Sequence, residues 1–120
     1  KTLVILDDLE LKMMCKEQKR CLDRLFGYVS THKNISVILC SQDAFNVPPI
    51  VRRCSNLWIL YQGTDLDSLA QLSRKAGYSV EEFKALFKKC PDFHDSIWID
   101  KTSKSPYKLR KNGFEIITVN

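Results

Sequence analysis

The sequence predicts an α/β fold with a mainly parallel sheet and flanking helices. Short apolar runs alternate with stretches of helical periodicity, and the runs Leu3–Leu6 and Leu57–Tyr61 are continuous rather than alternating. Continuous apolar runs are typical of strands buried on both faces of a parallel sheet. Strands that alternate with helices form βαβ units with right-handed crossovers. A chain of 120 residues is long enough for one ordinary domain or a part of a larger one.

Five strands are expected from the apolar runs. Four of these runs are short, and a fifth segment near the end of the chain is rich in β-branched residues, which favour strands. The expected strands are Leu3–Leu6, Ile35–Cys40, Leu57–Tyr61, Ile97–Ile99 and Phe114–Val119. The last of them is expected near an edge of the sheet.

Helices are expected between these strands. Apolar residues recur at spacings of three and four from Leu11 to Val29, which indicates an amphipathic helix. A second helix, after the third strand, is expected to stop at Gly77 because glycine adopts the left-handed conformation of a helix end. Ser79 and Glu82 have the spacing of a capping box, so a third helix begins there and ends before Pro91.

Composition narrows the functional classes. The chain is 44% hydrophobic and 28% charged, which argues against a disordered or collagen-like protein. No apolar run approaches the roughly 20 residues of a membrane-spanning helix, so no membrane span is predicted. The net charge is +5, and a stretch without acids holds five cations: Lys101, Lys104, Lys108, Arg110 and Lys111. Such a stretch can follow a phosphate backbone or form a solvated loop between two strands.

The five cysteines predict plain thiols that are buried or half-buried. Their number is odd and they form no C-x-x-C pair, which disfavours both a disulfide framework and a zinc site. His32 and His94 have no cysteine or carboxylate at ligand spacing. We therefore expect an intracellular, reducing compartment.

Polar residues follow the first two expected strands. Asp7 and Asp8 end the first, and Ser41 and Gln42 end the second. If these strands are neighbours in a parallel sheet, the two carboxylates and the amide converge on one edge. That set suits phosphoryl transfer, because one acid can hold hydrated Mg²⁺, the other can accept a proton, and a neutral amide can orient water. The alternative is an ordinary turn and helix cap.

Read together, these segments resemble the FtsK/HerA group of P-loop ATPases. Thr2–Asp8 resembles a Walker B motif, and Ile35–Gln42 resembles the next strand of that group, which ends in a polar sensor residue. The amino-acid sequence of these segments is similar to that of the genome-packaging ATPases of large DNA viruses (poxvirus-like) and of Polinton or adintovirus-type elements. Arg52–Gly63, Ile97–Asp100 and Tyr107–Arg110 fit the later strands of that branch.

The resemblance implies a function for the whole chain. Residues 1–120 would be the carboxyl-terminal part of one P-loop ATPase domain, from Walker B onward, with a partial RecA-like core. The protein would belong to an ATP-driven motor that translocates DNA or packages a genome. The implied cofactors are ATP and Mg²⁺, and the implied partners are double-stranded DNA and further copies in a ring, usually a hexamer. The implied location is the cytoplasm, a viral factory or the nucleus.

Residue roles follow from the same resemblance. Asp7 would be the Mg²⁺-associated acid, Asp8 the catalytic base and Gln42 the polar sensor. Arg52 or Arg53 would be an arginine finger that reaches the ATP of a neighbouring subunit. The alternative for the arginine pair is that both are helix-end charges on a solvated surface.

The sequence departs from the family pattern in two ways. Many relatives have Glu where this chain has Asp8. No G-x-x-x-x-G-K-[ST] motif occurs, although this loop cradles the nucleotide phosphates in the family. In the family it lies upstream of Walker B, so we interpret the chain as a segment of a longer polypeptide. The segment alone is expected to bind ATP weakly or not at all.

Two other classes fit parts of the sequence. A phosphoacceptor receiver domain also opens with an apolar strand and adjacent acids, but it needs an aspartate after its third strand, where this chain has Gln62 and Gly63. A degenerate, non-catalytic ATPase relic that binds nucleic acid or protein is the other alternative, because it accounts for the missing phosphate loop.

Overall fold

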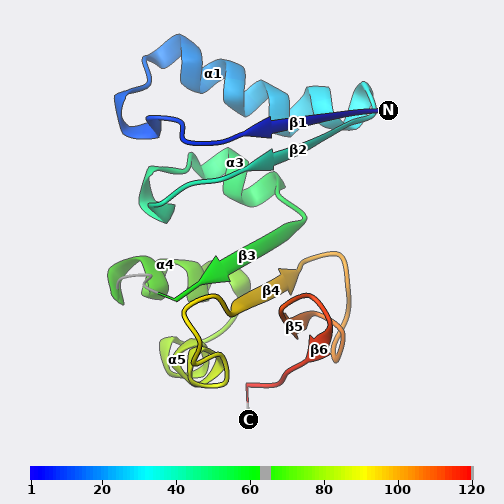
Figure 1. Cartoon of the computed structure of the whole chain (residues 1–120). Coiled ribbons are helices and arrows are strands. Elements are labelled where there is room, and N and C mark those ends of the chain that lie inside the picture. Colours follow the sequence, from blue (N-terminus) through cyan, green and yellow to red (C-terminus); the bar gives the residue numbers. More distant parts are fainter. Residues whose placement is uncertain (63–65, 120) are drawn as a thin grey trace. The chain divides into compact units, whose positions relative to one another are not determined.

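The computed structural model describes residues 1–62 and 66–119. These residues form two compact units, Lys1–Ser55 and Asn56–Asn120, called unit 1 and unit 2 below (Figure 1). Each unit has its own sheet and its own helices, so each is described by itself. Within the described ranges no helix is both long enough and apolar enough to cross a membrane, as predicted.

Unit 1 is built on a pair of parallel strands. β1 (Thr2–Leu6) pairs with β2 (Ile35–Leu39) in register along their whole length. The prediction that the first two strands are neighbours is therefore confirmed. Side chains alternate between a half-buried face and an exposed face, and the exposed face carries Leu3, Ile5 and Ile38.

A helical stretch connects β1 to β2, as the periodicity predicts. It comprises a short 3₁₀ turn, a nine-residue α-helix, a π-helical turn and a last short turn. Their bounds are η1 (Leu11–Met13), α1 (Lys16–Arg24), η2 (Leu25–Val29) and α2 (Ser30–His32). The Gln18 side chain accepts a hydrogen bond from the Cys15 amide at 2.9 Å, which fixes the start of α1.

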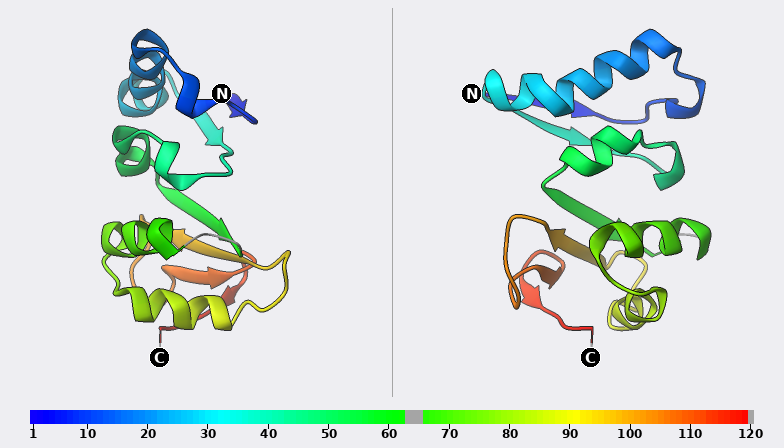
Figure 2. Two further views of the ribbon diagram at one scale, coloured as in Figure 1. Left: turned by 90° about the vertical axis from the view of Figure 1, so that its left-hand side faces the viewer. Right: turned by 180° about the vertical axis from the view of Figure 1, so that it is seen from behind.

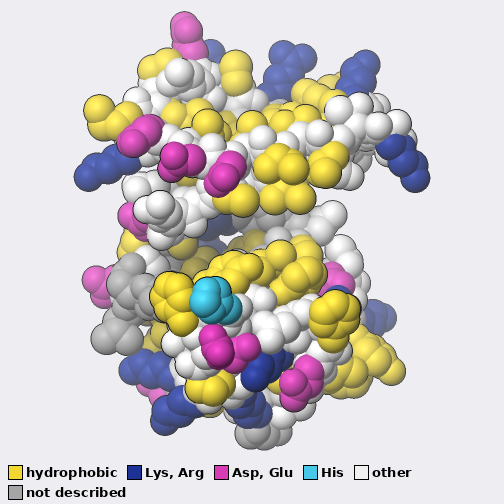
Figure 3. Space-filling model, in the orientation of Figure 1, with side chains coloured by type: hydrophobic (Ala, Val, Ile, Leu, Met, Phe, Trp, Pro, Cys, Tyr) yellow, Lys and Arg dark blue, Asp and Glu magenta, His cyan; other side chains and the backbone are white. Residues whose placement is uncertain are grey.

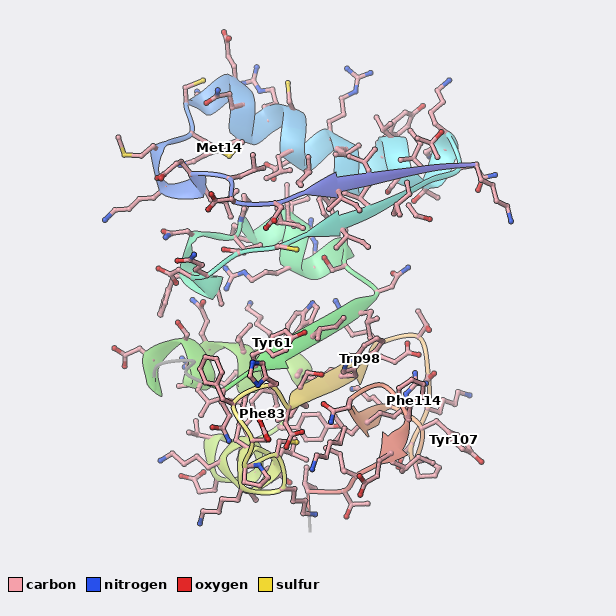
Figure 4. The ribbon with its side chains drawn as sticks, viewed as in Figure 1. Met14, Tyr61, Phe83, Trp98, Tyr107 and Phe114 are labelled. Atoms are coloured by element: carbon pink, nitrogen blue, oxygen red, sulfur yellow. The ribbon has the colours of Figure 1, made fainter. Side chains whose placement is uncertain are left out.

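The core of unit 1 is small. Leu11, Leu22 and Val51 are buried together, and Met14 and Phe26 pack against them (Figure 4). Two further short elements, η3 (Ala44–Asn46) and α3 (Pro49–Cys54), complete the unit. α3 was not among the expected helices, although its last turn holds Arg52 and Arg53, for which helix-end charges were one interpretation. It has a proline in its first turn, where the lack of an amide proton costs no hydrogen bond.

Unit 2 contains a four-stranded antiparallel sheet. Its strands, in spatial as well as chain order, are β3 (Leu57–Tyr61), β4 (Ser96–Asp100), β5 (Leu109–Lys111) and β6 (Glu115–Ile116). Parallel pairing is thus confined to β1 and β2 in the described structure. The predicted mainly parallel sheet, and with it the partial RecA-like core, is wrong.

The predicted parallel sheet differs from the observed one first at the connection between β3 and β4. Two helices, α4 (Leu66–Ala76) and α5 (Val80–Lys88), lie between the two strands and pack on each other. After these helices β4 starts beside the end of β3 and runs in the opposite direction, so Tyr61 is paired with Ser96. A parallel pair would instead need a crossover connection that brings the chain back to the starting end of β3.

The predicted helix signals in unit 2 are confirmed. Gly77 has φ +85° and follows the last residue of α4, and the next amide, that of Tyr78, bonds back to the Ser73 carbonyl at 2.9 Å. Ser79 and Glu82 form the reciprocal capping box at the start of α5.

The core of unit 2 lies between its helices and one face of its sheet. Figure 2 shows α4 and α5 on the same side of the strands. Phe83 from α5 and Ile97 and Ile99 from β4 are buried in this layer. In contrast, Tyr107 and Phe114 project outward (Figure 4).

The opposite face of β3 is exposed and apolar. Leu57, Ile59 and Tyr61 alternate along it with the inward-facing residues of the same strand. Figure 3 shows apolar side chains gathered over this strand.

Candidate functional site

The carboxyl ends of β1 and β2 form one edge of the sheet in unit 1. The last register pair joins Leu6 to Leu39, and the Cys40 amide then donates to the Leu6 carbonyl at 2.9 Å. Beyond this bond the segments that follow β1 and β2 are no longer paired. Asp7 and Asp8 leave from β1, and Gln42 lies three residues beyond the end of β2. The structure therefore brings the three predicted residues to the same end of one parallel pair.

Asp8 has an unusual backbone conformation. Its φ is +55°, in the left-handed region that few residues other than glycine adopt readily, although aspartate tolerates it. The chain turns here from the exposed sheet edge toward Leu11, whose side chain is buried and whose amide bonds to the Leu9 carbonyl at 2.8 Å. Backbone strain of this kind concentrates at functional sites. The turn presents both carboxylates to solvent.

The loop that carries Gln42 is held by its neighbours. The Ser41 hydroxyl donates to the Asp43 carbonyl at 2.9 Å. The Asp43 carboxylate accepts from the Phe45 amide at 2.8 Å and from the Asn46 side chain at 3.0 Å, so it caps η3. Sequence reasoning missed this role of Asp43, although an aspartate before a short apolar segment is a signal for a helix cap.

Gln42 itself is left available for an external ligand. Within the described part of the chain, its amide makes no side-chain hydrogen bond, and neither do the carboxylates of Asp7 and Asp8. All three side chains are exposed. The edge thus offers two carboxylates and one neutral amide on a backbone that local hydrogen bonds and the strand pairing hold in place.

The two arginines lie elsewhere in unit 1. Arg52 and Arg53 occupy the last turn of α3, where Arg52 is half-buried and Arg53 is exposed. Figures 1 and 2 show that α3 runs back from the carboxyl ends of the strands toward their amino ends. The structure does not bring this pair to the edge that carries Asp7 and Asp8.

The acidic edge offers few protein ligands to a metal ion. The described residues contain no group of three or more His, Cys, Asp or Glu side chains placed to hold a metal ion. Two adjacent carboxylates still fit Mg²⁺, which keeps several water ligands and takes others from nucleotide phosphates. They do not fit a metal that needs a full protein cage. Asp7 and Asp8 are thus compatible with a magnesium ion that takes most of its ligands from elsewhere.

The basic stretch near the end of the chain is engaged within unit 2. Arg110 pairs with Asp100 at 3.0 Å, and Lys111 pairs with Asp95 at 3.3 Å. Hydrogen bonds lower the pKa of Asp100 to about 2; those from Thr102 contribute most, and that from Ser103 contributes less. Two of the five cations are therefore neutralised by carboxylates that lie 10 and 16 positions earlier in the sequence.

Two further cations of this stretch lie against aromatic rings. The Lys101 ammonium is 5.1 Å from the centre of the Trp58 ring, and the Lys108 ammonium is 5.3 Å from that of Tyr78. Lys108 also reaches the carbonyl of Ala76 at 3.4 Å, near the end of α4. These contacts engage most of the stretch within unit 2, where its last part forms strand β5 rather than a solvated loop.

Comparison with family models, curated proteins and solved structures finds no match to this chain. The resemblance to packaging ATPases therefore depends on the motifs and their order alone.

Proposed function

We propose that unit 1 supplies the hydrolytic edge of an ATP-driven motor that translocates DNA or packages a genome. The observation that carries the proposal is the parallel pairing of β1 and β2, because it puts Asp7, Asp8 and Gln42 at one edge. The proposal does not depend on a mainly parallel sheet in this chain, because this one pair of strands forms the edge.

Each residue has a separate task at this edge. Asp7 would hold Mg²⁺, directly or through water, and the ion when bound offsets the negative charge of the phosphates. Asp8 would accept a proton from the attacking water. Gln42 would orient that water and contact the terminal phosphate, since a neutral amide does so without electrostatic repulsion.

The remaining partners follow from the same proposal. The motor would move double-stranded DNA and would hydrolyse ATP bound with Mg²⁺. Its active form would be a homo-oligomeric ring, a hexamer by resemblance. Arg52 or Arg53 would serve a neighbouring subunit, which agrees with their distance along α3 from the acidic edge of their own unit. All five cysteines are free, but four of them are exposed and only Cys90 is buried, so the expectation of buried or half-buried thiols is wrong. Free thiols suit a reducing compartment, in the cytoplasm, a viral factory or the nucleus.

A non-catalytic module that binds nucleic acid or protein is the second candidate. The observation that favours it is the lack of a G-x-x-x-x-G-K-[ST] motif in the sequence. Such a module keeps the fold of unit 1 without any need for a phosphate-binding loop. The two candidates differ in one measurable property, which is nucleotide hydrolysis by the complete gene product.

The decisive change is Asp8→Asn in the complete gene product. This substitution removes the proton acceptor but preserves size, so we expect ATP turnover to fall about 100-fold or more while ATP affinity stays the same. Steady-state ATPase assays with purified protein, together with equilibrium binding of ATP, measure both quantities. Gln42→Ala should lower turnover by a smaller factor.

Glu10→Gln is the matched control. Glu10 is an exposed acid close in sequence to Asp8, and its side chain makes no capping hydrogen bond. Its removal should leave turnover unchanged. Normal ATPase activity in the Asp8→Asn protein would show that Asp8 is not the base. A wild-type gene product without hydrolysis would instead favour the non-catalytic module. The 120-residue chain alone should have no ATPase activity above background.

A further inference from the structure

The positive charge of unit 1 is concentrated on one helical segment. Unit 1 contains nine Lys and Arg residues and six Asp and Glu residues. The segment Lys12–Arg24, which includes all of α1, holds five of the cations and only two of the acids. Outside this segment the basic and acidic residues of unit 1 are equal in number. The charge excess of the unit is therefore that of α1 and the turn before it.

Three of these cations form a continuous surface. Lys16, Lys19 and Arg20 are exposed, and together with Asp23 they line a shallow groove of about 400 Å³. Residues three and four apart lie on the same side of a helix, so these side chains project in one direction. We call Lys16, Lys19 and Arg20 the basic face of α1.

Nothing in the described part of the chain neutralises the basic face. Its three side chains form no ion pair there, unlike Arg110 and Lys111 in unit 2. Asp23 is half-buried, and its Oδ1 atom is shielded from solvent with no hydrogen-bond partner in the described structure. Glu17 is the other acid on α1 and is exposed. Three cations against these two acids leave a net positive surface.

The chemistry of the exposed side indicates the kind of polyanion. Leu22, the buried residue of α1, faces the core with Met14 and Phe26. The exposed residues of α1 are all charged or polar apart from one cysteine, so the helix lacks the apolar face that inserts into a membrane. It also lacks exposed aromatic rings, on which the bases of a single strand stack. Regularly placed cations without either feature suit the phosphates of a duplex.

We propose that the basic face of α1 binds the phosphate backbone of double-stranded DNA without regard to sequence. The choice of a duplex rests on the proposed function, in which DNA is the track of the motor. α1 rises about 1.5 Å per residue, so Lys16 and Arg20 are about 6 Å apart along its axis and can contact successive phosphates. Base edges are not needed for this contact, because phosphate contacts position a protein but do not specify sequence.

The test is duplex binding by the 120-residue chain without nucleotide. Fluorescence anisotropy of a labelled duplex compares the wild-type chain with a variant in which Lys16, Lys19 and Arg20 are all replaced by glutamine. Glutamine favours helix about as well as lysine, so α1 should persist, which circular dichroism checks. We expect affinity to fall about tenfold or more, and the slope of log affinity against log salt to fall by about 2.7, since three phosphate contacts are lost.

The control removes the same charge from unit 2. Lys75, Lys84 and Lys88 are exposed on α4 and α5, and their replacement by glutamine should leave affinity within about twofold of wild type. In the opposite direction, Glu17→Gln removes an acid from α1 and should tighten binding about twofold. This second variant tests the helix even if the triple variant folds poorly.

Several outcomes would overturn the inference. Equal losses in the α1 and control variants would mean that only net charge matters, and an unchanged affinity in the α1 variant would mean that DNA binds elsewhere or not at all. Equal binding of vesicles of anionic phospholipid would identify a lipid surface instead. Because the assay contains no ATP, its result is independent of the Asp8→Asn experiment. Duplex binding by the chain, together with no hydrolysis by the complete gene product, would reject the motor and leave this inference standing.

Discussion

The two units of this chain differ sharply in how much core they build. In unit 1 the fully buried apolar residues among those described are Leu11, Leu22 and Val51. Unit 2 is only slightly longer and buries many more, from both helices and from three of its strands or their flanks. They are Leu69, Leu72, Ala76, Phe83, Leu86, Cys90, Ile97, Ile99, Leu109 and Ile117. Chain length is therefore a poor guide to core size.

Sheet architecture accounts for the difference. An antiparallel sheet can leave one face to solvent, and in unit 2 two helices cover the other face. A parallel pair with apolar residues on both faces needs cover on both sides, but within unit 1 the side of Leu3, Ile5 and Ile38 is exposed. The candidate site thus lies in the unit with the smaller core. Binding regions are commonly drawn from the less stable parts of a fold.

The largest expected effect comes from truncation in the core of unit 2. Ile99 is 0% exposed and Ile5 is 59% exposed, so Ile99→Ala and Ile5→Ala remove the same atoms from opposite environments. Ile99→Ala should lower the free energy of unfolding of unit 2 by about 3 kcal/mol, and Ile5→Ala should change stability by less than about 1 kcal/mol. Both tryptophans, Trp58 and Trp98, lie in unit 2, so their fluorescence during urea unfolding measures the effect of Ile99→Ala. Hydrogen exchange of the β1 and β2 amides measures the effect of Ile5→Ala in unit 1.

The same pair of variants can contradict the comparison. If Ile5→Ala costs as much as Ile99→Ala, the exposed face of β1 is covered in solution, and the core of unit 1 is larger than its own residues build.

A somewhat smaller effect is expected from Leu22→Ala in unit 1. This residue is one of the three that form its buried cluster, so truncation should cost about 2–3 kcal/mol. Hydrogen exchange should show faster opening of the β1 and β2 amides, while the tryptophan transition of unit 2 stays in place. A parallel shift of the tryptophan transition would show that the two units unfold as one cooperative body.

The smallest effect concerns acid and unit 2. The pKa of Asp100 is lowered to about 2, mainly by hydrogen bonds from Thr102. A carboxylate whose pKa is lower in the folded state contributes stability above its ordinary pKa of 3.8, and this contribution is lost as the pH falls through the folded value. We therefore expect the urea midpoint reported by tryptophan fluorescence to fall between about pH 4 and pH 2.

Asp100→Asn should flatten this acid-dependent decrease, because asparagine does not titrate. Asp95 has a pKa lowered by its bond from Asn112, and it adds a dependence of the same sign. A midpoint that changes equally with pH in wild type and Asp100→Asn would rule out Asp100 as the source.

Much of the local structure could be predicted from the sequence. Gly77 and the Ser79–Glu82 capping box were located correctly, because these signals act through the backbone of the residues beside them. The shared edge of Asp7 and Gln42 was also predicted, since it needs only a single helical crossover between two neighbouring strands. Asp43 was missed as a cap because its helix is a single 3₁₀ turn.

Strand β5 was indicated only by the family resemblance of Tyr107–Arg110, and it shows why the residue pattern alone could not predict other parts. Its charged residues Arg110 and Lys111 conceal the strand pattern, and the structure tolerates them through ion pairs with Asp100 and Asp95. One local signal was present: Asn112 and Gly113 have φ of +52° and +81° and form the tight turn between β5 and β6, as an Asn-Gly pair often does.

The sequence by itself determined where the strands and most helices lie, how the helices are capped, and which acids and amide follow β1 and β2. Only the tertiary structure decided that β3 pairs with β4 in the antiparallel direction and that the basic stretch beyond β4 folds back on its own unit. The physical reason is how far apart in the sequence the interacting residues lie. Caps, turns and periodicity depend on residues a few positions apart, whereas the pairing of β3 with β4 joins residues separated by tens of positions, and the ion pairs join residues 10 and 16 positions apart. An apolar run such as Leu57–Tyr61 fits either kind of sheet, and only its pairing with β4 shows which one forms.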